Sequence, residues 1–233
     1  MRPGNTWWPA VGLVLFSAIP VFFGAVRVHQ LTSGAAITPE NARFFAAPLP
    51  VVLHIASATL FSIGGAFQFV PVLRERTRSW HRRVGPLLLG SGFVVAQSGL
   101  WMTQFYPWPE GDGQLLYLIR LVVGTAMLIF LGLAVRASLR REFKAHGAWM
   151  TRAYALGLGA ATQVFTHLPY LVLSSGKPGE LPRALMMAAG WAINLGVAEW
   201  HLRTADVGTS DELARGCDDS GRRSACLPSS RPL

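Results

Sequence analysis

The stretch His146–Pro169, HGAWMTRAYALGLGAATQVFTHLP, combines a basic start with a long uncharged run. Between Arg152 and Lys177 the chain carries no charged residue, which leaves room for an α-helix to cross a bilayer, because such a helix needs about 20 apolar residues. One helical face of the run carries three polar side chains, at spacings of three and four: Gln163, Thr166 and His167. We expect this face to point at other helices or at a cavity, since polar side chains rarely face lipid.

Composition extends this prediction to the whole chain. Of 233 residues, 51% are hydrophobic and 14% are charged, and the mean hydropathy is +0.35, which excludes an ordinary soluble protein. Six apolar runs are close to membrane-spanning length: Trp8–Val26, Ala46–Leu73, Gly85–Tyr106, Leu115–Val135, Met150–Leu173 and Leu181–Leu202. The sequence therefore predicts an all-α integral membrane bundle of about six transmembrane helices over residues 1–203.

The basic residues predict the orientation of this bundle. The loops at 74–83 and 136–152 hold five basic residues each, whereas the connections near 27–45 and 174–183 hold four in total and the 107–114 loop holds none. Basic loops stay in the cytoplasm, so both termini are predicted to be cytoplasmic and the protein to lie in a bacterial inner membrane. The net charge of +9 is thus explained by orienting loops that contact anionic phospholipids, and nucleic acid is not an expected partner.

The segment 204–233 differs from the rest of the chain. It is rich in Asp, Arg, Ser, Gly and Pro, which predicts a disordered cytoplasmic tail. The two cysteines of the protein, Cys217 and Cys226, lie in it, and we expect no disulfide between them in a reducing compartment.

Polar and aromatic residues fall in the middle or outer half of five predicted helices, where random substitutions would scatter through all depths. We predict that they line a polar chamber that faces outward. Its members are His54, Gln97, Trp101, Gln104, Arg120, Gln163, Thr166, His167, Trp191 and Asn194. Arg120 either extends to the outer interface or has an anionic partner, which would be a carboxylate, a phosphate or a haem propionate.

The histidines form a second pattern. His54 and His167 each lie about seven residues inside the outer ends of their spans, and neutral imidazoles from two helices are the axial ligands of a b-type haem. His81 and His146 lie at the cytoplasmic edge, where they would hold a second haem. Alternatively, they would hydrogen-bond backbone carbonyls, or each other across adjacent loops, and fasten a loop to a helix. In the haem hypothesis His54 and His167 bind the iron and Arg120 contacts a propionate.

Three segments also resemble a known family: GAFQFVPVLRERTRSWHRRVGPLLLGSG, SGLWMTQFYP and HGAWMTRAYALGLGAATQVFTHLP. They are similar to the bacterial predicted membrane proteins of the domain-of-unknown-function family DUF2306. The resemblance implies an inner-membrane bundle of six or a similar number of helices, and it implies no activity. Its motifs correspond to residues at the cytoplasmic edge: His81, Arg82, His146, Trp149, Met150 and Arg152. The similarity to di-haem b-type membrane cytochromes is architectural only.

Two functions follow as hypotheses. The first is an electron-transfer or oxidoreductase membrane subunit with bis-histidine haem b and a quinone or redox partner. The second is a transporter or membrane receptor that binds a small anionic or lipid-like ligand in the outer chamber. An enzyme acting on lipid or isoprenoid substrates ranks last, because the predicted spans contain no Asp and only Glu199 as an acidic residue.

Overall fold

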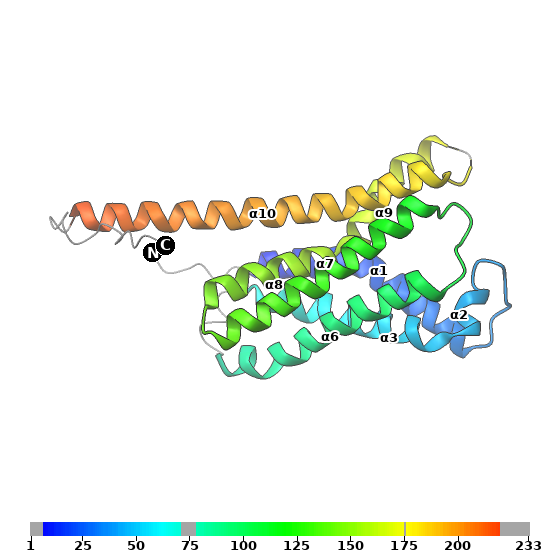
Figure 1. Ribbon diagram of the computed structural model, residues 1–233, viewed down its shortest axis with the longest axis horizontal. Coiled ribbons are helices and arrows are strands. Elements are labelled where there is room, and N and C mark those ends of the chain that lie inside the picture. The colour runs from blue at the N-terminus through cyan, green and yellow to red at the C-terminus, as the bar shows by residue number, and fades with distance from the viewer. Residues whose placement is uncertain (1–6, 71–77, 175, 220–233) are drawn as a thin grey trace. The chain divides into compact units, whose positions relative to one another are not determined.

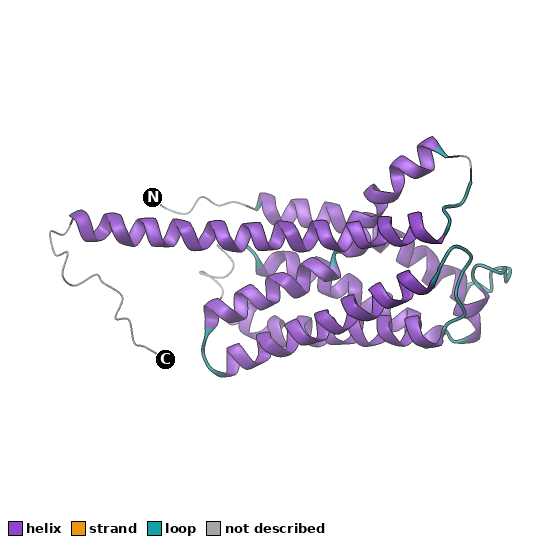
Figure 2. Cartoon of the chain, turned by 45° about the horizontal axis from the view of Figure 1, so that its top comes forward, coloured by secondary structure: helices purple, strands orange, loops and turns teal. Residues whose placement is uncertain are grey.

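The computed structural model describes residues 7–70, 78–174 and 176–219, and all regular structure in them is helical (Figures 1 and 2). The helices are α1 (Trp8–Thr32), α2 (Ala42–Ala46), α3 (Pro48–Thr59), the π-helix η1 (Leu60–Gly64), α4 (Gly65–Gln68), α6 (Arg78–Phe105), α7 (Gln114–Leu139), α8 (Phe143–Gly157), α9 (Gly159–Leu173) and α10 (Glu180–Asp219). Five spans are long and apolar enough to cross a membrane, and the bent pair α8–α9 makes a sixth. The predicted all-α membrane bundle is confirmed.

The fifth predicted span is the one that the structure corrects. We expected one continuous helix over Met150–Leu173, but α8 begins earlier, at Phe143, and the chain bends by 42° between α8 and α9. The bend lies at a Gly-Leu-Gly sequence whose glycines have close neighbours. A Cβ at Gly157 would lie 2.8 Å from the ring of Phe61, and one at Gly159 would clash with Trp191 Nε1. Close packing on both sides therefore accounts for glycine at the break.

A second irregularity lies beside this break. The helix that begins at Pro48 widens into the π-helical turn η1, and the hydroxyl of Tyr154 on α8 donates a hydrogen bond to the carbonyl of Ser62 in that turn, at 2.6 Å. Phe61 of η1 and Tyr154 also belong to the buried core, where their rings lie 5.7 Å apart. The core of the bundle is thus built around two interrupted helices rather than around straight ones.

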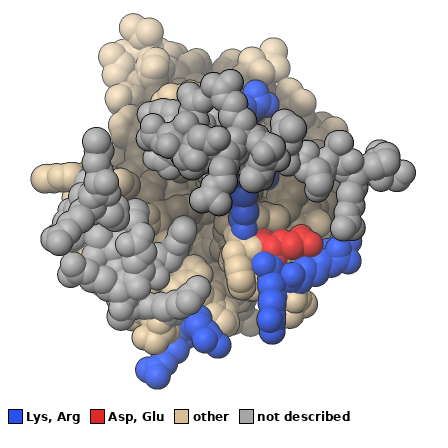
Figure 3. Space-filling view, turned by 90° about the vertical axis from the view of Figure 1, so that its left-hand side faces the viewer, with Lys and Arg blue, Asp and Glu red and all other residues tan. Residues whose placement is uncertain are grey.

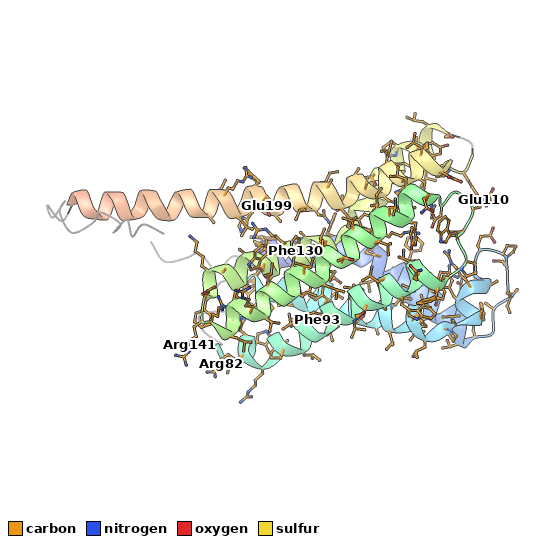
Figure 4. The ribbon with its side chains drawn as sticks, viewed as in Figure 1. Arg82, Phe93, Glu110, Phe130, Arg141 and Glu199 are labelled. Carbon is orange, nitrogen blue, oxygen red and sulfur yellow. The ribbon has the colours of Figure 1, made fainter. Side chains whose placement is uncertain are left out.

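The two ends of the bundle differ in charge. Figure 4 places Arg82 and Arg141, from the two arginine-rich loops, at one end and Glu110 at the other. We call these the arginine end and the Asp112 end. Lys and Arg side chains gather on the arginine end in the space-filling view (Figure 3), and Arg82, Arg140 and Arg141 are exposed. This separation is the one that the orientation prediction requires.

The last helix, α10, crosses a boundary between two compact units, residues up to Leu195 and residues from Gly196. The first unit contains the bundle helices described above, and the second contains the remainder of α10. This helix continues to Asp219, beyond the point at 204 where we expected disorder to begin. Residues 220–233, with Cys226, lie outside the described residues, as does the side chain of Cys217.

Candidate functional site

An ion cluster at the Asp112 end is centred on one buried carboxylate. Asp112 lies in the loop before α7, its side chain is 3% exposed, and its oxygens accept from two arginines of different helices. Arg120, two turns into α7, contacts Oδ2, and Arg183, in the first turn of α10, donates from Nε to Oδ1 at 2.6 Å. In the structure, therefore, the anionic group beside Arg120 is the carboxylate of Asp112. The sequence argument had not connected Asp112 with it.

A third arginine, Arg43 of the short helix α2, lies near the same cluster. Its guanidinium is 4.6 Å from the centre of the Phe44 ring, and Nη1 donates to the carbonyl of Pro107 at 3.4 Å. Its Nε is buried, without a hydrogen-bond partner among the described residues. Burial lowers the pKa of Arg43; Asp112 raises it, and the positive charges of Arg120, Arg183 and Arg27 lower it further.

The formal charges of this cluster do not cancel. Three arginines (Arg43, Arg120 and Arg183) and one aspartate (Asp112) give a net charge of 3 − 1 = +2. Arg120 and Arg183 share the two oxygens of the carboxylate, so Arg43 lacks a direct carboxylate contact in the described residues. This is an arrangement in which an additional anion would be stabilised.

A cavity of about 350 Å³ extends from this cluster into the bundle. Arg43, Asp112 and Arg120 border it, and apolar side chains of α6 and α7, such as Val95 and Met127, form much of its wall. Four of the predicted chamber residues border this cavity: His54, Arg120, Gln163 and Trp191. Sequence reasoning missed Arg43 and Asp112, because both lie in connections that we had considered only as loops.

A separate groove of about 650 Å³ contains three more predicted residues, Gln97, Trp101 and Gln104. They lie on the exposed face of α6, opposite Leu49 and Leu53 of α3. The predicted single chamber is therefore divided into an internal cavity and an external groove.

The family of the protein can be stated at this point. The family model described as "Predicted membrane protein (DUF2306)" matches residues 51–202. The chain belongs to this family. No curated protein and no solved structure matches it. The matched range includes Asp112, Arg120 and Arg183 but not Arg43, so the DUF2306 region contains most of the ion cluster and the helix before it supplies the remaining cation.

Two further predicted residues of this DUF2306 protein join helices instead of bordering the cavity. Thr166 donates to the carbonyl of Met186 at 2.8 Å, and Asn194 donates to the carbonyl of Ala155 at 3.1 Å and accepts from Thr162. These bonds connect α8 and α9 with the first part of α10. They explain the polar face of the His146–Pro169 stretch by helix packing, since buried polar groups need partners inside a membrane.

The histidines do not meet in one space. His54 borders the cavity, and its Nδ1 lies 3.1 Å from the carbonyl oxygen of Val95 and 3.0 Å from Ser98 Oγ. His167 does not border the cavity, and its Nδ1 bonds the carbonyl of Gln163 in its own helix at 2.7 Å. A haem needs both axial imidazoles aimed at one iron, so this arrangement does not fit a haem held by His54 and His167.

At the arginine end, His146 has a structural contact. Its Nδ1 lies 2.8 Å from the carbonyl oxygen of Ala134, which joins α8 to α7 as the fastening alternative describes. His81 lies near the start of α6 and does not border the cavity. In the described part of the chain no group of three or more His, Cys, Asp or Glu residues is placed to hold a metal ion.

Proposed function

We propose that this membrane protein binds a small amphipathic anion in the internal cavity, as a transporter or a membrane receptor. The observation that carries the proposal is Arg43. Its side chain borders the cavity, and it is the arginine of the cluster that has no carboxylate contact among the described residues. A charged group beside an apolar cavity is costly without an opposite charge, and an anionic ligand would supply that charge.

The walls of the cavity indicate the chemical character of the rest of the ligand. The cationic residues lie at the Asp112 end, whereas deeper wall positions are occupied by side chains such as Val95, Val123 and Met127. A volume of about 350 Å³ falls at the lower end of the range for small-molecule sites. The ligand that suits this site has a carboxylate or phosphate group near Arg43 and Arg120 and an apolar portion along the wall.

The electron-transfer hypothesis lacks comparable support. It rests on His54 and His167 as a pair of axial ligands, and only His54 borders the cavity. A quinone or redox partner was inferred from that same pair. We therefore do not propose haem b as a cofactor.

The test compares ligands that share a chain and differ in charge. Purified protein in neutral maltoside micelles is heated with decyl phosphate, with decanol or with inorganic phosphate, and its unfolding temperature is recorded. We expect decyl phosphate to stabilise the protein by roughly 2–3 kcal/mol near saturation, because a ligand that binds only the folded state adds its binding free energy. Decanol lacks the charge that Arg43 requires and should give a smaller shift.

Matched arginine variants locate the effect. Arg43→Gln should abolish the difference between decyl phosphate and decanol. Arg82→Gln, which removes an exposed arginine at the opposite end, should preserve it. Equal shifts for the two ligands, or an undiminished phosphate effect in Arg43→Gln, would contradict the proposal.

A further inference from the structure

The internal cavity and the external groove meet at a single side chain. Leu100 of α6 borders both hollows, and it packs against Gly124 of α7. A Cβ added at Gly124 would lie 2.7 Å from Leu100 Cδ2 and 2.8 Å from Cγ. Glycine at this position therefore gives the leucine side chain its space, and the leucine closes the gap between α6 and α7.

We propose that an anionic lipid of the surrounding bilayer reaches the cavity sideways, between α6 and α7, with Leu100 and Gly124 as the gate. This proposal rests on the proposed function, since its head group occupies the anion site beside Arg43. The apolar portion begins along the cavity wall, and the acyl chain continues past Leu100 into the external groove. The ligand is then a membrane lipid with a phosphate or carboxylate head group, and not a solute from the aqueous phase.

The groove has the surface that an acyl chain requires. Its apolar residues are open to the surroundings of the bundle: Leu53 is 45% exposed and Phe105 is 64% exposed. In a membrane, such a surface is covered by lipid chains. Trp101 and Gln104 lie at the Asp112 end of the groove, within the last two turns of α6, where amphipathic side chains commonly meet the head-group region.

Gln97 gives the groove a polar group at greater depth. It is exposed and lies eight residues before the end of α6, about 12 Å below that end at helical rise. An amide facing hydrocarbon at this depth is unfavourable unless it has a partner. An ester carbonyl of a lipid whose head lies in the cavity would provide an acceptor for it.

Opening the gate needs little rearrangement. Leucine side chains exchange between staggered rotamers, and the atoms that approach Gly124 belong to the end of this flexible side chain. The gate can therefore open by a side-chain rotation combined with a small separation of two helices. One turn further along α6, the hydroxyl of Tyr117 on α7 donates to Gln104 Oε1 at 2.8 Å, and this bond holds the two helices together at the Asp112 end.

A reversible crosslink tests the gate. In a protein with Cys217→Ser and Cys226→Ser, the double variant Leu100→Cys/Gly124→Cys places a sulfur near the present Leu100 Cγ, at a distance from the Gly124 Cβ that suits a disulfide. The control pair Gly64→Cys/Leu88→Cys joins η1 to α6 away from the gate, where the Gly64 Cβ would lie 3.6 Å from Leu88 Cγ. Each variant is studied oxidised and reduced in phosphatidylcholine nanodiscs.

Two probes are compared: palmitoyl lysophosphatidic acid supplied from donor vesicles, and water-soluble butyl phosphate. We expect oxidation of the gate pair to slow loading of the lipid by roughly tenfold or more, with recovery on reduction, because a closed gate limits access. Butyl phosphate should still bind, and the control pair should load lipid equally well in both states.

The outcomes separate the two proposals. If the oxidised gate pair loads lipid as fast as the reduced form, lateral access is overturned while the anion site stands. If neither probe binds to the reduced protein, the anion site itself fails. If the nanodiscs contain dimers in which a second copy of the protein covers the groove and excludes the lipid, the proposal is also overturned.

Discussion

Arginine gathers at both ends of the bundle, but the two groups differ in what surrounds them. At the arginine end, Arg82, Arg140 and Arg141 are exposed. At the Asp112 end, Arg120 and Arg183 are 26% and 28% exposed and share a carboxylate that is 3% exposed. Charges in water cost little to maintain, whereas charges beside an apolar cavity must be paired or bind an anion. The number of arginines in the loops predicts orientation, whereas partly buried arginines need a charged partner, which Asp112 supplies to Arg120 and Arg183.

The largest expected effect is that of Asp112→Asn. It would leave three guanidinium groups near one another without a carboxylate, and breaking a buried pair of this kind costs about 3–5 kcal/mol. Equilibrium unfolding in mixed micelles measures the loss. Glu142→Gln, at an exposed acidic residue of the arginine end, is the control and should change stability by less than about 0.5 kcal/mol. Similar losses of stability in both variants would contradict the proposed difference between the Asp112 end and the arginine end.

A second variant removes one of the paired cations. Arg183→Gln should destabilise the protein by about 1–2 kcal/mol, a value reduced for the solvent exposure of this side chain. Arg83→Gln at the arginine end should be nearly neutral because Arg83 is exposed. If Arg183→Gln also proves neutral in the same unfolding experiment, Arg120 alone is sufficient to hold Asp112.

The arginine end has its own expected phenotype, which is adhesion to anionic lipid. In vesicles that contain phosphatidylserine, Arg82→Gln and Arg140→Gln should each weaken the association of anionic lipid with the protein by about 1 kcal/mol, and added salt should reduce the difference. Spin-labelled phosphatidylserine reports the association. Binding of decyl phosphate in the cavity should be unchanged, and a parallel loss of cavity binding would show that the two ends are coupled.

The smallest effect is expected for the exposed ion pairs that join the outer loops. Lys177 lies 2.9 Å from Glu110 and 3.7 Å from Glu40, and these carboxylates raise its pKa above the ordinary value. A raised pKa stabilises the folded state below the ordinary lysine pKa, and this contribution disappears as the pH rises through the folded-state value. Lys177→Gln should therefore lower the unfolding temperature slightly at neutral pH and not at all once the pH is above the folded-state pKa of Lys177. A difference that persists in alkali would point to a role other than charge.

Several parts of this picture could be obtained from the sequence because they depend on neighbouring residues. The apolar runs located the spans, and the basic loops at 74–83 and 136–152 indicated a common end, as Figure 4 shows for Arg82 and Arg141. The polar face of Gln163 and Thr166 was also placed correctly against another helix. Helical periodicity and hydropathy depend on residues that are close together in the chain, so a single sequence is sufficient to recognise them.

The site required contacts between residues that are far apart in the chain. Asp112 is joined to Arg183 across 71 positions, and no local pattern marks that pair. In the sequence, Arg43 is only a basic residue in an outer connection, and its position beside the cavity is visible only in the structure. The division of the predicted chamber into a cavity and a groove likewise depends on where Leu100 meets Gly124.

An all-helical membrane bundle with arginine-rich loops can be deduced from the residues alone, because transfer into lipid is governed by the apolar length of each segment. Three features cannot be deduced in this way: one span is bent beside a π-helical turn, a buried aspartate accepts hydrogen bonds from arginines of two helices, and Arg43 borders a cavity. Those features follow from side-chain packing between helices, and hydropathy does not encode which helices meet.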